Sequence, residues 1–130
     1  PYRSVCTISS HDMPTLRQWW DENISRTQEY YNTMLYREGP APHPLPGWLA
    51  RDIIARHLTS PSMLCILSIQ DWLAIDEALR LPDANAERIN IPDNPKHYWR
   101  YRMHINIEEL AASKDYLKNI TELIAQGGRF

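Results

Sequence analysis

Several residue types are scarce in this chain of 130 residues, which has one phenylalanine, four glycines, two cysteines and a net charge of only −2. Two cysteines exclude a disulfide-rich secreted scaffold. The small net charge provides no field that would recruit nucleic acid or an anionic membrane, so we expect neither as a partner. No apolar run approaches the roughly 20 residues that a membrane-spanning helix needs.

The two cysteines and the tryptophans bear on where side chains lie. Cys6 and Cys65 both stand in apolar, strand-like runs, so we expect buried free thiols in a cytoplasmic protein rather than a disulfide. Five tryptophans and seven tyrosines accompany the single phenylalanine. Aromatic rings with a polar edge suit half-wet surfaces such as sugar clefts and interfaces, and a Trp-rich core is the alternative.

The chain alternates strand-like and helical patterns. The run at about 63–69 is apolar without alternation, which predicts a strand covered on both faces, as in a parallel sheet. Capping signals at Ser25 and at Asn106 each predict the start of a helix. The expected elements are strands at about 3–9 and 63–69, helices at about 14–21, 25–37, 47–58, 70–79 and 106–126, a stiff Pro-rich connector at 39–47, and a loop at 80–98.

This order predicts an α/β fold that is mostly helical, with parallel strands joined by helical crossovers. Two strands alone would leave both sheet edges unpaired. We therefore expect the chain to be part of a larger barrel or sheet and, in isolation, to self-associate through exposed strand edges.

His11 and Asp12 stand where the first strand run ends and a helix begins, which is where α/β folds build active sites. One interpretation is a helix-capping aspartate beside a structural histidine. A metal site would need further ligands at fixed spacing, and a Ser-His-Asp triad would need a nucleophile elbow; the sequence has neither pattern. The remaining interpretation is a glycosidase-type site, in which both side chains hydrogen-bond sugar hydroxyls as positive charge develops on the ring.

A basic aromatic segment occupies residues 96–102 (Lys-His-Tyr-Trp-Arg-Tyr-Arg). Such residues stack on the bases of single strands in some nucleic-acid-binding proteins. The net charge opposes that interpretation, and no second basic patch would extend a groove. Stacking on a sugar face and packing at the rim of a barrel remain as alternatives.

Three blocks, taken in order, resemble one known family. They are residues 2–20 around Ser10-His11-Asp12, residues 68–74 around Gln70-Asp71, and residues 87–92 followed by 98–102. Together they are similar to the His-Asp block, the Gln-Asp block and the closing motifs of the 4-alpha-glucanotransferases (amylomaltases, or disproportionating enzymes). The residues within these blocks are most similar to those of the branch that contains the plant cytosolic disproportionating enzyme. Ser10 stands where the family usually has threonine, and the closing motif has tyrosines where many members have asparagine and tryptophan.

The resemblance implies a (β/α)8 barrel (TIM barrel), of which residues 1–130 are the C-terminal portion with the last two β/α units, two short strands and five to six helices. Asp12 would be the third catalytic carboxylate, which stabilises the transition state. His11, Gln70, Asp71 and Asn90 would contact the substrate.

The family places its nucleophile and its general acid on earlier strands, and nothing in this chain matches their blocks. The resemblance therefore implies that this chain alone is inactive. It also implies α-1,4-glucans and maltooligosaccharides as substrates, with no metal and no organic cofactor. A non-catalytic carbohydrate-binding or interaction domain is the alternative.

Overall fold

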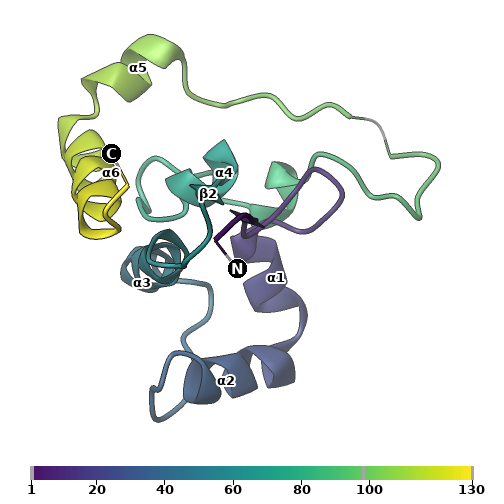
Figure 1. Ribbon diagram of the computed structural model, residues 1–130. Coiled ribbons are helices and arrows are strands. Elements are labelled where there is room, and N and C mark those ends of the chain that lie inside the picture. Colours follow the sequence, from purple (N-terminus) through teal and green to yellow (C-terminus); the bar gives the residue numbers. More distant parts are fainter. Residues whose placement is uncertain (1, 98, 130) are drawn as a thin grey trace.

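The computed structural model describes residues 2–97 and 99–129, and it confirms a mixed α/β, mostly helical architecture (Figure 1). Two short parallel strands lie among six α-helices and one 3-10 helix in this part of the chain. The elements are β1 (Val5–Cys6), α1 (Leu16–Glu22), α2 (Ile24–Thr33), α3 (Gly47–Leu58), β2 (Leu64–Cys65), α4 (Ile69–Leu73), the 3-10 helix η1 (Ala84–Glu87), α5 (Ile107–Ala112) and α6 (Lys114–Gln126).

The two strands pair in parallel, with Val5 opposite Leu64 and Cys6 opposite Cys65, as the strand–helix–strand order predicts. Each is much shorter than expected. The expectation that the run at 63–69 is covered on both faces is wrong, because Leu64 is 46% exposed. Val5, which lies opposite Leu64, is 57% exposed. The described helices pack against the opposite face, where Cys65 and Leu67 lie against the core.

Helix α3 forms the centre of the core, and its bounds are those that the sequence predicts. Leu49 and Ile53 pack on one side of it against α1 and α2, in a cluster that includes the fully buried Trp20. Ile54 and Leu58 pack on the other side against Leu123 of α6. Helix α6 therefore lies beside α3, and the extended segment before α5 brings the chain across the molecule to reach it (Figure 1).

Three of the expected helices, at 25–37, 70–79 and 106–126, differ in their boundaries from those found. Helix α2 is capped by the side chain of Asn23, which accepts from the backbone N–H of Arg26, so the expected capping box at Ser25 is wrong. The expected long C-terminal helix is two helices, because Ser113 leaves helical geometry at ψ 70°. Helix α4 ends at Leu73 instead of at about 79, and helix α2 ends at Thr33 instead of at about 37.

The cysteines are free, as predicted, but they are half-buried rather than buried. They stand opposite each other in the parallel pair. Burial is the main reason that the pKa of the Cys65 thiol is raised, and the neighbouring Cys6 adds to it.

Candidate functional site

The loop that carries His11 and Asp12 connects the end of β1 to α1. Both side chains are about half exposed, at 53% and 48%. The cap of α1 is Thr15, whose hydroxyl accepts from the backbone N–H of Gln18. The interpretation of Asp12 as a helix cap is therefore wrong, which leaves its carboxylate free for other contacts.

Three residues that the sequence singled out meet at this carboxylate. The Asn90 side-chain amide donates to Oδ1 of Asp12 at 2.6 Å. Nε2 of His11 lies 3.2 Å from Oδ2. The backbone N–H of Asn90 also donates to the carbonyl of His11 at 3.0 Å, and Arg88 donates to the carbonyl of Asp12 at 3.4 Å. The segment 88–90 thus holds both the side chain of Asp12 and its backbone.

Trp99 connects the basic aromatic segment to the same loop. Its ring centroid lies 5.0 Å from that of His11, with the planes tilted by 38°, and the side chain stays 62% exposed. Tyr98, which the closing motif includes, lies outside the described residues. The Trp99 ring therefore packs against His11 while most of its surface stays open to solvent.

Gln70 and Asp71 lie beneath the loop instead of beside Asp12. Asp71 is fully buried; its Oδ1 accepts from the backbone N–H of Leu16 at 2.8 Å, and its Oδ2 accepts from the hydroxyl of Ser9. The amide of Gln70 donates to the backbone carbonyl of Glu87 at 3.2 Å. In this arrangement Asp71 has no surface for a sugar, so its sugar contact stays a prediction without a geometric basis here.

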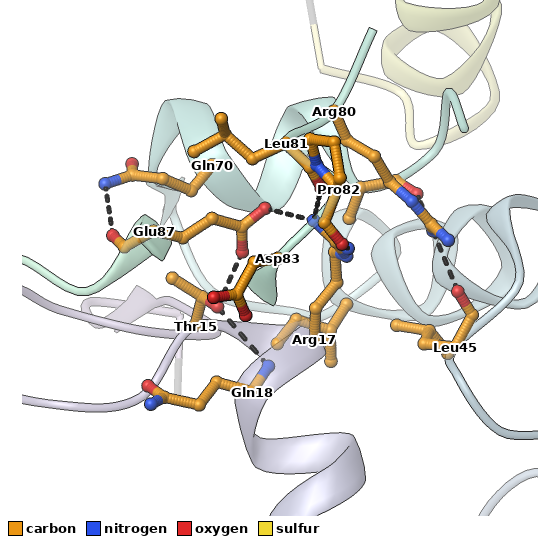
Figure 2. Close-up of polar contacts among 12 residues, drawn as sticks. Thr15, Arg17, Gln18, Leu45, Gln70, Arg80, Leu81, Pro82, Asp83 and Glu87 are labelled. Carbon is orange, nitrogen blue, oxygen red and sulfur yellow. Dashed lines mark hydrogen bonds and ion pairs between the residues drawn. The ribbon is translucent and has the colours of Figure 1, made fainter. Parts of the chain in front are cut away.

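Glu87 is a second buried carboxylate beside α1 (Figure 2). We call Asp71, Glu87 and their buried partners Thr15, Arg17 and Gln70 the buried layer. One of its oxygens accepts from the Thr15 hydroxyl at 2.8 Å, and the other accepts from Arg17 at 2.6 Å. The Arg17 guanidinium also donates to the carbonyls of Leu81 and Pro82. Desolvation by burial raises the pKa of Glu87, and the hydrogen bond from Thr15 and the charge of Arg17 oppose that rise.

A small cavity of about 50 Å³ separates the loop from the buried layer, and Gln70 and His11 both line it. Sites for small molecules typically have volumes of roughly 300–1,000 Å³, so this cavity is too small to hold a sugar. Gln70 therefore cannot contact a sugar within this cavity. A ligand would instead bind on the outer side of the loop, where Asp12 and Trp99 are exposed.

The described residues show neither a metal-binding cluster nor a membrane-spanning helix. No cluster of three or more His, Cys, Asp or Glu side chains there could hold a metal ion. None of the helices in that part of the chain is long and apolar enough to cross a membrane.

Sequence reasoning missed the contacts that form the buried layer. Thr15 stands just before the helical pattern, a readable N-cap signal. No local signal pairs Arg17 with Glu87, because the two residues are 70 positions apart in the sequence.

Comparison with known proteins adds to this geometry. A family model described as 4-alpha-glucanotransferase matches residues 1–108, which include β1, β2 and the whole loop site. The chain belongs to the 4-alpha-glucanotransferase family. This membership favours the glycosidase-type interpretation of His11 and Asp12 over a metal site or a triad.

Individual relatives carry the same family name. The chain is 38% identical over 128 residues to the rice (Oryza sativa subsp. japonica) 4-alpha-glucanotransferase DPE2, covering 98% of this chain and 14% of the relative. It is 30% identical over 122 residues to the 4-alpha-glucanotransferase of Chlamydia pneumoniae, covering 93% of this chain and 23% of the relative. The C. muridarum protein of the same name is 32% identical over 110 residues, with 84% and 20% covered. The chain thus spans less than a quarter of each of these relatives.

Proposed function

We propose that residues 1–130 are the C-terminal portion of the (β/α)8 catalytic domain of a 4-alpha-glucanotransferase, and that β1 and β2 are the last two barrel strands. The parallel pairing of β1 and β2 and the helical connection between them support this assignment. So does the exposed strand face at Val5 and Leu64, which further strands and their side chains would cover in a closed barrel.

The proposed reaction transfers an α-1,4-glucan segment, or a single glucose, between maltooligosaccharides with retention at the anomeric carbon. A carboxylate nucleophile attacks that carbon while the glycosidic C–O bond breaks, and a carboxylic acid protonates the departing 4-oxygen. The 4-hydroxyl of an acceptor sugar then attacks the glycosyl-enzyme, returns its proton to the same acid/base group and releases the nucleophile. No metal or organic cofactor is required. The two reacting carboxyl groups belong to earlier parts of the full-length protein.

Asp12 is the group in this chain that we assign to that reaction, and its geometry is the observation that carries the proposal. Its carboxylate stands at the carboxyl end of a barrel-type strand and is half exposed. Among residues 2–97 and 99–129, each of its oxygens has one protein partner, His11 or Asn90. Because a carboxylate offers about four acceptor positions, two remain for sugar hydroxyls. Hydrogen bonds from these hydroxyls strengthen as the ring becomes oxocarbenium-like, which stabilises the transition state.

The neighbouring residues have supporting roles in this proposal. His11 contacts the same sugar, and the exposed ring of Trp99 offers it an apolar face. Asn90 orients the Asp12 carboxylate through its 2.6 Å bond.

Replacement of Asp12 by Asn in the full-length protein tests the proposal. Loss of the negative charge lowers kcat for maltotriose disproportionation by about 10²–10³-fold, the range for removing one preorganised transition-state contact. Asp115→Asn, an exposed carboxylate on α6, is the matched control and leaves kcat unchanged. Product sugars resolved by thin-layer chromatography provide the measurement. An unchanged kcat in the Asp12→Asn variant would remove this residue from the mechanism.

The isolated chain gives a second test, because it lacks the nucleophile and the general acid. We expect no transfer products from maltose or maltotriose. Transfer by the purified 130-residue chain would contradict the assignment of those two groups to earlier strands. If the full-length protein binds maltooligosaccharides in a titration but never transfers them, the function is that of a carbohydrate-binding domain instead.

A further inference from the structure

Asp71 is the buried carboxylate that reaches both ends of the His11–Asp12 loop. Ser9 lies before the loop and Leu16 lies after it, and each donates one hydrogen bond to a different oxygen of Asp71. Asp71 itself is held at the start of α4, where its backbone N–H donates to the Ser68 hydroxyl at 3.2 Å. A single side chain on α4 therefore links the end of β1 to the start of α1.

The partners of Asp71 are unusual for a buried charge. Its carboxylate is fully buried, and no ion pair joins it to a basic side chain among residues 2–97 and 99–129. Within that described part of the chain, both partners of the carboxylate are neutral donors, the Ser9 hydroxyl and the Leu16 backbone amide. Removing a charge from water without a counter-ion costs stability, and a neutral residue of similar size would avoid that cost. A role in fixing the loop explains why a hydrogen-bonding side chain, instead of an apolar one, stands here.

The loop has few other anchors from below. Thr15 is bonded to Glu87 at its far end. Between Ser9 and Thr15, Asn90, Arg88 and the ring of Trp99 contact His11 and Asp12 from the other side of the loop. Asp71 thus contributes a hydrogen bond to each end of the loop from the side that faces the core. A displacement of about 1 Å at a reacting group can cost roughly 10²-fold in rate.

We propose that Asp71 is a positioning residue, which holds the loop so that the Asp12 carboxylate meets the sugar in its productive geometry. Asp71 touches no substrate in this role and acts only through the loop. The inference rests on the proposed function, because it requires Asp12 to act in the reaction.

Three variants of the full-length protein separate positioning from general damage. Asp71→Ala removes the two hydrogen bonds that Asp71 accepts from Ser9 and Leu16. We expect kcat to fall by about 10²-fold with little change in KM. Asp71→Asn is the conservative variant: its Oδ1 still accepts from Leu16, and the Ser9 hydroxyl can turn to accept from its amide. We expect it to retain most of the kcat. Glu77→Gln is the matched control, since Glu77 also accepts from a backbone N–H, that of Gly47 at 2.7 Å, away from the loop.

A double-mutant cycle with Asp12→Asn provides the decisive measurement. If Asp71 acts only through Asp12, then Asp71→Ala lowers kcat no further in the Asp12→Asn background. A full additional loss there, or a normal kcat in the single Asp71→Ala variant, overturns the inference. Rates are normalised to the folded fraction measured by circular dichroism. If Asp71→Ala does not fold, Ser9→Ala removes one of the two hydrogen bonds to Asp71, together with the contact between Ser9 and Ser68. A normal kcat in that variant likewise overturns the inference.

The same set of variants distinguishes this inference from the function on which it rests. An unchanged kcat in Asp12→Asn contradicts the proposed function, and the positioning role falls with it. A large loss in Asp12→Asn together with a normal kcat in Asp71→Ala contradicts the positioning role alone.

Discussion

Asp12 and Asp71 follow neighbouring strands of the same parallel pair, yet their surroundings are opposite. Asp12 is 48% exposed and is held by side chains of His11 and Asn90. Asp71 has no exposed surface and is held by a hydroxyl and a backbone amide. The difference shows that an aspartate following a strand of this parallel pair can be either open to solvent or fully enclosed by the protein.

The buried layer and the exposed loop also differ in what a lost contact costs. In the buried layer, removing one partner leaves the other buried without a hydrogen-bond or charge partner. The cost of keeping that group away from water then lowers the free energy of unfolding. On the exposed loop, water replaces a lost partner, so we expect the effect to fall on the geometry of the loop and, under the proposed function, on the rate of transfer. Pairs of variants that place the same change in both regions test this comparison.

The largest effect is expected for the ion pair of the buried layer. Glu87→Ala leaves Arg17 buried without its counter-charge, and we expect a loss of about 3–5 kcal/mol in the free energy of unfolding of the full-length protein. Glu22→Ala breaks an exposed pair with Arg26 and should cost about 0–1 kcal/mol. Urea unfolding of the two variants measures the difference. Equal losses would remove the distinction between the two regions.

Asn90→Asp tests the exposed loop. The change puts two carboxylates in contact where Asn90 now donates to Asp12 at 2.6 Å. Like charges in contact cannot both ionise easily, so the pair binds one proton at low pH and loses it as pH rises. The pair that holds one proton has a hydrogen bond between its two side chains, as the native pair does. We therefore expect kcat/KM to fall at high pH by about 10- to 100-fold and to recover in acid. The size of the fall corresponds to the loss of a charge-assisted hydrogen bond of roughly 1.5–3 kcal/mol. A pH–rate profile parallel to that of the native enzyme would contradict the assigned contact.

Helix caps offer a smaller contrast. Thr15 caps α1 and also donates to the buried Glu87, whereas Asn106 forms an exposed capping box with Glu109 at the start of α5. We expect Thr15→Ala to cost about 2 kcal/mol and Asn106→Ala to cost about 1 kcal/mol of stability. Thermal unfolding of both variants is the measurement. A larger loss from Asn106 would show that the contact with Glu87 adds nothing to the cap.

The smallest effect concerns pH. Burial raises the pKa of Glu87 in the folded state above its value in the unfolded chain. The folded state therefore holds this proton more tightly, and the contribution of Glu87 to stability falls as pH rises from the ordinary glutamate pKa to the raised one. Glu87→Gln removes this dependence. The stability of the native protein should fall more steeply with rising pH in that range than the stability of the variant, as followed by urea unfolding at several pH values; identical slopes would contradict it.

Local patterns predicted part of this molecule well. The amphipathic spacing of α3 gave its bounds, and the capping box at Asn106 is confirmed. The one expected helix after Asn106 failed at Ser113, whose hydroxyl bonds back to the carbonyl of Glu109. The strand at 63–69 was over-predicted because an apolar run does not reveal how many neighbours a strand has in its sheet.

The candidate site shows the same division. His11, Asp12 and Asn90 were found from motif blocks, and the structure brings them together. Gln70 and Asp71 came from the same reasoning, but they lie beneath the loop. A motif indicates which residues matter to a family, and it does not say which of them face the ligand.

By itself, the sequence determined the α/β class, the family and the place of the His11–Asp12 pair at a strand end, because these depend on local periodicity and on short motifs. The tertiary structure alone decided that Asp12 is open to solvent while Asp71 and Glu87 are buried anchors. Solvent access depends on contacts across 55 to 70 positions of the chain, between Leu16 and Asp71 and between Arg17 and Glu87. No local pattern records such contacts, and they set the environment on which the role of a carboxylate depends.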